Sequence, residues 1–550
     1  MLINITHLEK TIGTNELYSN FSFSIEEDEK IALVGKNGVG KSTLINLISG
    51  ADTDYSGLIE IKKDCRMVFT LQEHFLDDNV TALDYILKNV PNFLTLQNII
   101  DTYPNFMGND LNLISAYSEA IDSFSTLEYY AIEDKIIQTL QEFHIDFDKA
   151  LSSMQTLSGG EKRFVELTKV MYANADIAFI DEPTNHMDYI GKEFFIDWMK
   201  KFPKALFIIT HDRDVLMEMN NIIELKDKKI QSYRGNYDAY LEQNTLHTIT
   251  KVKKYEDSLK ELEKIHTQMI LARVKKLSAK SDSGRMNAKV MEERFKKMYE
   301  VLKTSLDKPS FWIDQDSIEK FDKNIITSYE KYKDKSIVIS KNKSGEHKQE
   351  LLRVTNLSIG YSYPLFTPVT FILSHEDRVL LKGRNGAGKS SLVKSIIAKE
   401  KEISPIKIYT GHIKKSQKLI IGIYEQEISP KFLTMSLFDA LLKTYEDANI
   451  SINQEGIFKL MGTYLFKPQQ DKDILIKNLS GGQKARFQII RMLACNPNLL
   501  ILDEPTNHLD LPSVEELEKY LINFPGAILY ISHDSYFSSK MNPLVIPIVK

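Results

Sequence analysis

The segments GKNGVGKS at residues 35–42 and GRNGAGKS at residues 383–390 decide the fold. Both fit the pattern G-x-x-x-x-G-K-[ST], in which glycines let backbone N–H groups close around phosphate and the lysine reaches the outer phosphates. Each segment follows an apolar run, at 31–34 or 379–381, and opens a helical pattern. Because this is the strand–loop–helix context that the motif requires, we expect two nucleotide-binding sites in an α/β fold.

The predicted nucleotide-binding residues lie in these two loops and at the start of each following helix. They are Gly35, Lys36, Asn37, Gly38, Val39, Gly40, Lys41, Ser42 and Thr43 in the first copy, and Gly383, Arg384, Asn385, Gly386, Ala387, Gly388, Lys389, Ser390 and Ser391 in the second. The hydroxyl groups of Ser42 and Ser390 are candidate Mg²⁺ ligands.

Further motifs recur after each loop at matching distances. LSGGE at 157–161 and LSGGQ at 479–483 precede IDEPTNH at 180–186 and LDEPTNH at 502–508. Ser158 and Asp181 are 23 positions apart, as are Ser480 and Asp503, and each aspartate precedes a histidine, His211 or His533, by 30 positions. One duplicated unit explains this identical spacing.

This order of motifs resembles a tandem ATP-binding-cassette ATPase over most of residues 1–240 and 350–550. The resemblance implies two P-loop cassettes that bind ATP and Mg²⁺ and hydrolyse ATP. It assigns the attacking water to Glu182 and Glu504, and the γ-phosphate to His211 and His533. The implied metal ligands are Ser42, Asp181 and the Q-loop residue Gln72 in the first copy, and Ser390, Asp503 and Gln426 in the second; Asp188 and Asp510 close the D-loops.

The two Ser-Gly-Gly segments imply sites built from both cassettes. Because cassettes of this kind face head to tail, one segment is expected to cap the nucleotide held at Lys389 and the other the nucleotide at Lys41. The capping residues are Ser158, Gly159 and Gly160 for Lys389, and Ser480, Gly481 and Gly482 for Lys41. These Ser-Gly-Gly segments are the signatures of the two cassettes. Both copies carry the glutamate and an intact signature, so both sites are expected to hydrolyse ATP.

The aromatic residue that would stack on adenine differs between the copies. Tyr361 stands where the family places it in the second copy, whereas Ile12 occupies the matching place in the first. Tyr18 is a possible substitute there, and a core position is its alternative interpretation.

Length and composition exclude several classes of protein. A chain of 550 residues exceeds the size of one hydrophobic core, and its 43% hydrophobic and 26% charged residues are typical of globular proteins. The apolar runs are too short to span a bilayer, so we expect a cytoplasmic protein. Two cysteines exclude a disulfide framework or a zinc site. A net charge of −5 means that any nucleic-acid binding needs a local basic patch.

Two segments lie outside the repeated unit. From Gln72 to Ser158 is 86 positions, whereas from Gln426 to Ser480 is 54, so the first cassette, residues 1–243, carries about 32 extra residues, expected around 85–115. Residues 77–150 hold 13 Asp and Glu against three Lys, which favours a solvated face or a protein contact over RNA. The second segment is a linker, 244–349, before the second cassette, 350–550.

The linker pattern predicts an antiparallel helical hairpin. Apolar residues recur at steps of three and four, and a polar break at 278–284 separates a first arm of ~38 residues, or ~57 Å, from the second. Residues 251–306 contain 15 Lys and Arg against eight Asp and Glu, a net charge of +7. The charges gather at the bend, which predicts RNA contact or, alternatively, a solvated coiled-coil surface. The candidate RNA-binding residues are Arg273, Lys275, Lys276, Lys280, Arg285 and Lys289.

Two cassettes with a basic helical linker resemble the ABC-F family. The resemblance implies binding at the exit site of the 70S ribosome, with 23S rRNA and P-site tRNA as partners, and no membrane or DNA partner. It implies a monomer whose two cassettes dimerise within the chain. We favour antibiotic resistance by displacement of drugs from the peptidyl-transferase or tunnel region; a housekeeping translation factor, the ATPase subunit of a transporter with separate membrane chains, and a DNA-repair ATPase are the alternatives.

Overall fold

The computed structural model describes residues 1–13, 15–70, 80–185, 187–306, 349–398, 405–425, 428–464, 466–479, 481–507 and 509–549. The chain divides into two compact units. One contains Met1–Tyr237 and Ile337–Lys550, and the other is Asp238–Ser336. Within the described ranges, no helix combines the length and the apolar character that crossing a membrane requires.

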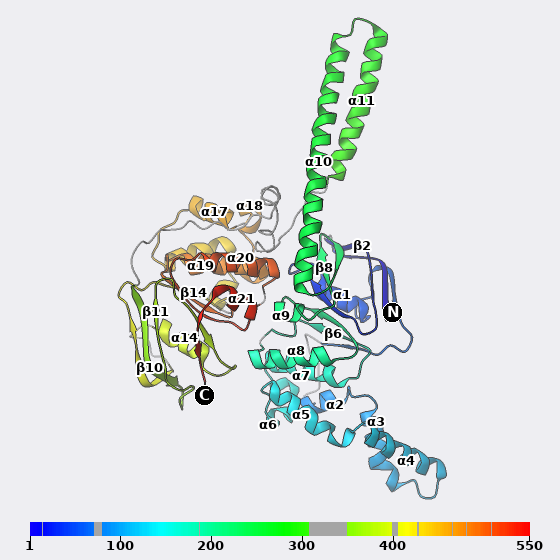
Figure 1. Ribbon diagram of the computed structural model, residues 1–550, viewed down its shortest axis with the longest axis vertical. Coiled ribbons are helices and arrows are strands. Elements are labelled where there is room, and N and C mark those ends of the chain that lie inside the picture. The colour runs from blue at the N-terminus through cyan, green and yellow to red at the C-terminus, as the bar shows by residue number, and fades with distance from the viewer. Residues whose placement is uncertain are drawn as a thin grey trace. The chain divides into compact units, whose positions relative to one another are not determined.

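A twisted six-stranded sheet forms the centre of the first cassette (Figure 1). Its strands read as continuous apolar runs because helices cover both faces, as is usual for parallel sheets. The order is β5 (Met67–Phe69), β6 (Ile177–Asp181), β7 (Ala205–Ile209), β3 (Lys30–Val34), β8 (Asn221–Lys226) and β9 (Lys229–Arg234), with β9 antiparallel to β8. Helix α1 (Lys41–Ile48) follows β3, and α8 (Tyr189–Lys201) and α9 (Arg213–Leu216) follow β6 and β7.

A three-stranded antiparallel sheet packs on this core. It has the order β2 (Asn15–Ile25), β1 (Ile3–Ile12) and β4 (Ser56–Ile61). Residues from both sheets and from α1 share one hydrophobic cluster, which includes Leu8, Tyr18, Leu44 and Phe207.

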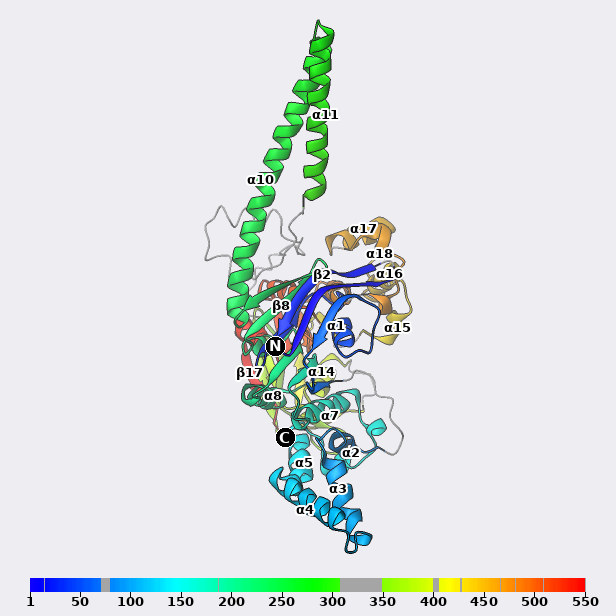
Figure 2. The ribbon, with the colours of Figure 1, turned by 90° about the vertical axis from the view of Figure 1, so that its right-hand side faces the viewer.

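A helical part with its own hydrophobic cluster completes the first cassette. Its elements are α2 (Ala82–Leu87), α3 (Phe93–Thr102), η1 (Tyr103–Asn105), α4 (Leu111–Thr126), η2 (Tyr129–Ala131), α5 (Ile132–Glu142), α6 (Phe147–Ala150), η3 (Met154–Thr156) and α7 (Gly159–Tyr172). Both α3 and α4 extend away from the sheets (Figures 1 and 2). The extra sequence is expected around 85–115, and we propose that it is this helix pair, although α4 runs on to Thr126. The second cassette has no described helix between the elements that match α2 and α5.

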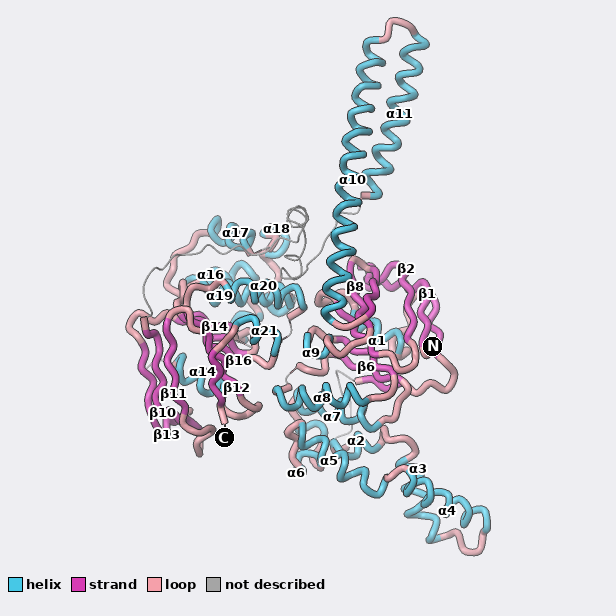
Figure 3. The backbone as a smooth tube through the Cα atoms, viewed as in Figure 1, coloured by secondary structure: helices cyan, strands magenta, loops and turns pink. Residues whose placement is uncertain are grey.

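The second cassette repeats the same plan. Its parallel sheet has the order β14 (Ile421–Tyr424), β15 (Leu499–Asp503), β16 (Ala527–Ile531), β12 (Arg378–Lys382) and β17 (Leu544–Pro547). Figure 3 shows its second sheet as a separate layer, β11 (Val369–Ser374), β10 (Glu350–Gly360) and β13 (Lys407–Lys415). The helices are α14 (Lys389–Ile397), α15 (Pro430–Leu433), α16 (Leu437–Asp447), α17 (Gln454–Thr463), α18 (Pro468–Asp471), η4 (Ile476–Asn478), α19 (Gly481–Leu493), α20 (Leu511–Ile522) and α21 (Ser535–Met541). The predicted α/β fold with two P-loop cassettes is confirmed.

The second unit is a hairpin of two long helices, as predicted. Helix α10 (Tyr237–Ser278) has 42 residues and begins seven positions before the expected linker, and α11 (Asp282–Ser305) returns beside it in both views (Figures 1 and 2). Lys276 and Glu292 form an ion pair of 2.9 Å between the arms. Ser281 ends the bend, because its hydroxyl accepts a hydrogen bond from the N–H of Gly284 and so caps α11.

Candidate functional site

The loop between β3 and α1 is shaped by its glycines. A Cβ atom on Gly35 would lie 2.6 Å from the carbonyl oxygen of Leu225, and Gly40, which caps α1, has φ 104°. Neither position accepts another residue without strain. Lys41 is buried at the centre of the loop, where its Nζ donates to the carbonyl oxygens of Gly35 at 2.8 Å and Lys36 at 3.2 Å. The loop therefore has the cradle form that phosphate binding needs.

The second loop repeats this arrangement. Lys389 Nζ donates to the carbonyl oxygens of Gly383 at 2.7 Å and Arg384 at 3.1 Å. Gly388 has φ 95°, and a Cβ on Gly383 would lie 2.5 Å from the carbonyl oxygen of Ile548. The same strand-edge crowding thus selects glycine at the start of both loops.

Each loop places a serine hydroxyl beside the aspartate that ends a central strand. Ser42 donates to Asp181 Oδ2 at 2.7 Å, and Ser390 hydrogen-bonds Asp503. A hydroxyl and a carboxylate are oxygen ligands that suit Mg²⁺, which normally takes its remaining ligands from phosphate and water. In the described ranges no group of three or more His, Cys, Asp and Glu residues forms a complete metal cage. The predicted ligands Gln72 and Gln426 lie outside the described residues.

Glu182 and His211 lie beside the first loop. The backbone of Glu182 has φ 48°, and its N–H donates to the carbonyl oxygen of Ile209 at 2.8 Å, which turns the side chain into the site. Burial raises the pKa of this carboxyl to about 8, while the Lys41 ammonium opposes the shift. His211 Nε2 is 3.6 Å from Glu182 Oε1. Burial lowers the pKa of His211 to about 3, so its ring is neutral at pH 7.

Both ring nitrogens of His211 are buried without a hydrogen-bond partner among the described residues. An orphaned pair of buried polar atoms is costly, and a ligand that supplied a partner would remove that cost. The position of this ring beside the phosphate loop fits the γ-phosphate contact predicted for it.

Glu504 and His533 reproduce the pair in the second cassette. Glu504 also has φ 48°, and its N–H donates to the carbonyl oxygen of Ile531 at 3.0 Å. His533 Nε2 is 3.3 Å from Glu504 Oε1 and 3.4 Å from Lys389 Nζ. Burial raises the pKa of Glu504 to about 7 and lowers that of His533 to about 3.

The two cassettes contact each other reciprocally at the phosphate loops. The N–H of Asn37 donates to Asp510 Oδ2 at 3.2 Å, and the N–H of Asn385 donates to Asp188 Oδ2 at 3.1 Å. The D-loop aspartate of each cassette therefore faces the phosphate loop of the other. Such two-way pairing of equivalent residues is the contact pattern of a pseudo-twofold dimer.

Two cavities accompany these contacts. One of ≈ 440 Å³ follows the second loop, and the predicted residues that line it are Tyr361, Arg384, Asn385, Gly386, Gly388, Lys389, Ser390, Ser391, Asp503, Glu504 and His533. The other, of ≈ 210 Å³, lies between the cassettes and is lined by Asn37 together with both pairs of glutamate and histidine, Glu182 with His211 and Glu504 with His533.

The signature residues are not gathered into these cavities. Ser158 is exposed and caps α7, accepting a hydrogen bond from the N–H of Glu161 at 3.3 Å, and it is absent from the described lining of the cavity at Lys389. Ser480 lies outside the described residues. Capping of the opposite nucleotide by the signatures stays a prediction.

The two candidate adenine-stacking tyrosines have different environments. Tyr361 is 45% exposed at the edge of the larger cavity. Tyr18 is fully buried, and its hydroxyl donates to the carbonyl oxygen of Gly40. The structure therefore shows Tyr18 in the core position and not in the adenine-stacking position. Its hydrogen bond to Gly40 stabilises the first phosphate loop.

One contact at the second site involves a histidine that sequence reasoning missed. His144, at the end of α5, has Nε2 2.8 Å from Asp188 Oδ2 and Nδ1 3.2 Å from Arg384. It joins the D-loop of the first cassette to the phosphate loop of the second. A lone histidine after a helix has no motif around it, so no sequence signal indicated this role.

The candidate RNA-binding residues gather at the bend of the hairpin. Five of the six are exposed, namely Arg273, Lys275, Lys280, Arg285 and Lys289. Lys276, the sixth, is partly buried and forms the ion pair with Glu292. Large apolar side chains are also exposed there, including Leu277 at 77% and Met286 at 67%.

Comparison with known proteins finds matching family profiles and relatives that match over almost the whole chain. The family profile described as "ABC transporter" matches residues 18–185 and 366–507, and a second profile with the same description matches 223–313. The putative ATP-binding protein YdiF of Bacillus subtilis is 28% identical over 99% of this chain and 80% of its own length. ABC transporter F family member 5 of Arabidopsis thaliana is 25% identical over 99% of this chain and 75% of its own.

Solved structures share the fold at low sequence identity. A crystal structure of an archaeal ribosome recycling factor, aABCE1, with the ribosomal stalk protein aP1 matches with a TM-score of 0.54 at 15% identity, covering 98% of this chain and 87% of that one. A structure named RNase-L Inhibitor matches with a TM-score of 0.51 at 14% identity and the same coverage.

Proposed function

The chain belongs to the ABC transporter family. From this premise we propose that it is a tandem-cassette ATPase of the ABC-F type that binds the ribosome and acts there. ATP hydrolysis is the activity of its two cassettes. The proposal concerns which residues perform the hydrolysis and what the hairpin contacts.

The two phosphate loops bind the nucleotides, and the carboxyl groups of Glu182 and Glu504 act on the attacking water. Lys41 and Lys389 turn from loop carbonyls toward the outer phosphates, and the neutral rings of His211 and His533 hydrogen-bond the γ-phosphate. Glu182 orients the attacking water, as Glu504 does in the second site. A carboxyl whose pKa is about 8 or about 7 suits this role, because a general base works best when its pKa lies near the working pH.

The metal sites would be formed by Ser42 with Asp181, and by Ser390 with Asp503. These residues would hold Mg²⁺, which would supply positive charge against the negative charge that develops during phosphoryl transfer. The reciprocal contacts of Asp188 and Asp510 support a head-to-tail pairing that closes over both nucleotides.

The basic bend of the hairpin carries the ribosome proposal. Exposed lysine and arginine side chains at one end of a helical pair, in a chain with a net charge of −5, give a local footprint for a phosphate backbone. The exposed Leu277 and Met286 add apolar surface at the same bend, and exposed apolar patches mark contact sites. An RNA-rich partner such as 23S rRNA, with P-site tRNA beside it, matches this combination.

Antibiotic resistance is the role that we propose for this contact, with the bend displacing a drug from the peptidyl-transferase or tunnel region. A housekeeping translation factor is the second candidate, favoured by the ribosome-recycling description of the archaeal protein that shares the fold. Deletion of 278–284 separates the two: loss of drug tolerance with normal drug-free growth indicates resistance, and slow drug-free growth indicates the housekeeping role.

Charge reversal at the bend tests the ribosome proposal. Replacing Lys275, Lys280, Arg285 and Lys289 by Glu should weaken binding to purified 70S ribosomes, and each lost phosphate contact should reduce the slope of log K against log[salt] by roughly 0.7 to 0.9. Lys276 is left unchanged because its partner is Glu292.

A matched control reverses the same number of charges elsewhere on the hairpin. Lys251, Lys253, Lys254 and Lys264 are exposed on α10, far from the bend in sequence. Their reversal should leave the salt slope closer to that of the unmodified chain. Equal affinity and slope in the bend variant and the unmodified chain would contradict the proposal.

A further inference from the structure

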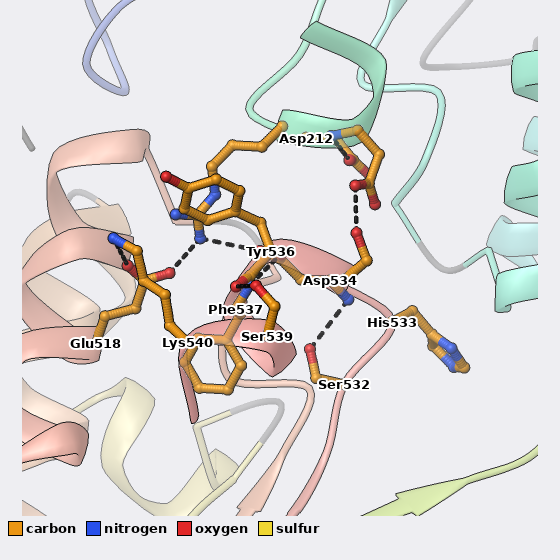
Figure 4. Close-up of polar contacts among 12 residues, drawn as sticks. Asp212, Glu518, Ser532, His533, Asp534, Tyr536, Phe537, Ser539 and Lys540 are labelled. Atoms are coloured by element: carbon orange, nitrogen blue, oxygen red, sulfur yellow. Dashed lines mark hydrogen bonds and ion pairs between the residues drawn. The ribbon is translucent and has the colours of Figure 1, made fainter. Parts of the chain in front are cut away.

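The loops that carry His211 and His533, the histidines predicted to contact the γ-phosphate, touch each other across the cassettes. We define switch loop 1 as residues 211–214 and switch loop 2 as residues 533–536. Helix α9, which begins in switch loop 1, packs against α21, which begins in switch loop 2. Figure 4 shows the polar contacts around switch loop 2.

Arg213 is the centre of this contact. Its side chain is 2% exposed, and its Nη2 donates to Glu518 of α20 and, at 3.2 Å, to Asp534 Oδ2. The guanidinium carbon lies 4.3 Å from the centre of the Tyr536 ring. A planar cation that is paired with two carboxylates and stacked on an aromatic ring is held in one orientation. Switch loop 1 is thereby anchored in the second cassette.

Lys192 makes a second connection. Its buried Nζ pairs with Asp212 at 2.9 Å and with Asp214, and it donates to the carbonyl oxygen of His533 at 3.3 Å. The hydroxyl of Ser535 donates to Asp214. A continuous path of polar contacts thus joins the backbone beside His211 to the backbone of His533.

The first cassette supplies both cations of this connection, and the second cassette has no equivalent of them. The spacing that aligns Asp188 with Asp510 aligns Lys192 with Val514, and the spacing that aligns His211 with His533 aligns Arg213 with Ser535. Both bridging cations therefore come from the first cassette, and the uncharged residues at the equivalent positions of the second cannot form the same ion pairs. The chemistry of the two sites is duplicated, but this link is not.

We infer that Lys192 and Arg213 are positioning residues that join the two switch loops, so that ATP turnover at one site depends on the state of the other. A displacement of His211 moves Asp212 and Arg213, and the buried ion pairs transmit it to Asp534 and to the carbonyl group of His533. Buried charges resist separation, because a charge that loses its partner in an apolar setting is costly. The loops therefore shift together.

Turnover in a functional double-mutant cycle tests the link. Glu504→Gln inactivates the second site, and in a coupled protein it should lower total ATP turnover by about tenfold, since coupling between sites is typically 5 to 150-fold. In the Arg213→Gln, Glu518→Gln background, which removes one cation and one anion and so keeps the net charge, Asp534 and Lys540 each lose one of their partners. The same change should there lower turnover only about twofold, the loss expected of two independent sites.

Two further variants keep the test decisive. Lys192→Met breaks the other connection and should likewise reduce the effect of Glu504→Gln. This variant takes the place of the Arg213 variant if that one fails to fold. As a control, Lys200→Gln with Glu218→Gln removes an exposed ion pair of 3.0 Å within the first cassette and should preserve the tenfold effect. An effect of Glu504→Gln that is equal with and without the bridging residues, whether twofold or tenfold, would overturn the inference.

Discussion

The two ATP sites agree closely in their reacting groups and differ in what surrounds them. Glu182 and Glu504 share a φ of 48°, and their oxygens lie 3.6 Å and 3.3 Å from the paired histidine nitrogens. Around these pairs, the first site has a buried tyrosine beneath its loop, and the second has an exposed tyrosine at its rim. The bridging cations Lys192 and Arg213 come from the first cassette alone.

This contrast shows which parts of a duplicated unit can diverge. The glutamate, histidine, serine and aspartate have the same proposed role in phosphate chemistry in each site, and the same role requires the same geometry. Residues that would contact the base, or that connect the two cassettes, have different surroundings in the first and the second cassette. The geometry of the glutamate and histidine is therefore the same in both cassettes, whereas the residues around each pair differ.

Removal of both carboxyl groups that we propose to be catalytic should have the largest effect. Glu182→Gln with Glu504→Gln is expected to lower kcat by about 10² or more, because a positioned acid–base group contributes 10² to 10⁴. ATP binding should persist, since the phosphate loops are unchanged. Steady-state turnover and equilibrium nucleotide binding measure the two properties, and turnover at the unmodified rate would remove Glu182 and Glu504 from their assigned role.

The two tyrosines should separate base recognition from loop support. Tyr361→Ala should weaken ATP affinity at the second site by about tenfold, because stacking on a base contributes about 1 to 3 kcal/mol. Tyr18→Phe should leave ATP affinity nearly unchanged and reduce the free energy of unfolding by about 1 kcal/mol, the usual value of one hydrogen bond.

Urea denaturation and titration with a fluorescent ATP analogue would measure both variants. Phe at position 361 is the matched control for stacking, since it keeps the ring. Equal affinity for ATP in Tyr361→Ala and the unmodified chain would show that the exposed tyrosine does not contact the base.

The same two carboxyl groups should also give the stability of the chain a pH dependence. Folding raises the pKa of Glu182 to about 8 and that of Glu504 to about 7, from an ordinary value of 4.5. The folded chain therefore binds more protons than the unfolded chain between pH 4.5 and these values, so this contribution is present below pH 4.5 and is lost as the pH rises through 7 to 8. Urea midpoints at pH 5 and pH 8.5 should differ less in the double Gln variant, and an identical difference would contradict the assigned shifts.

The sequence predicted the repeated chemistry because that chemistry depends on local motifs. GKNGVGKS and GRNGAGKS each form the loop between a strand and a helix, and the 30-residue spacing brings each aspartate and histidine to the same edge of a sheet. The helical hairpin followed from periodicity in the same way, although α10 begins at Tyr237, where no break in the pattern marks its start.

Contacts between distant segments carried no such signal. Arg213 and Glu518 are 305 positions apart, and neither belongs to a motif that names its partner. Tyr18 was ambiguous because a strand residue near a loop can face either the core or the nucleotide, and only the register of β2 on β1 decides which. Long-range pairing of this kind depends on how distant segments pack together, and a short stretch of sequence does not show this.

Sedimentation of the Glu182→Gln, Glu504→Gln chain tests the central claim most directly, because a chain that binds ATP without turnover should remain on its partner. In a cell lysate supplied with ATP, it should travel with 70S ribosomes, and it should leave them when Lys275, Lys280, Arg285 and Lys289 are also replaced by Glu. Migration with the membrane fraction, or unchanged ribosome binding after the charge reversal, would contradict a ribosome-directed ATPase that acts through the bend of its hairpin.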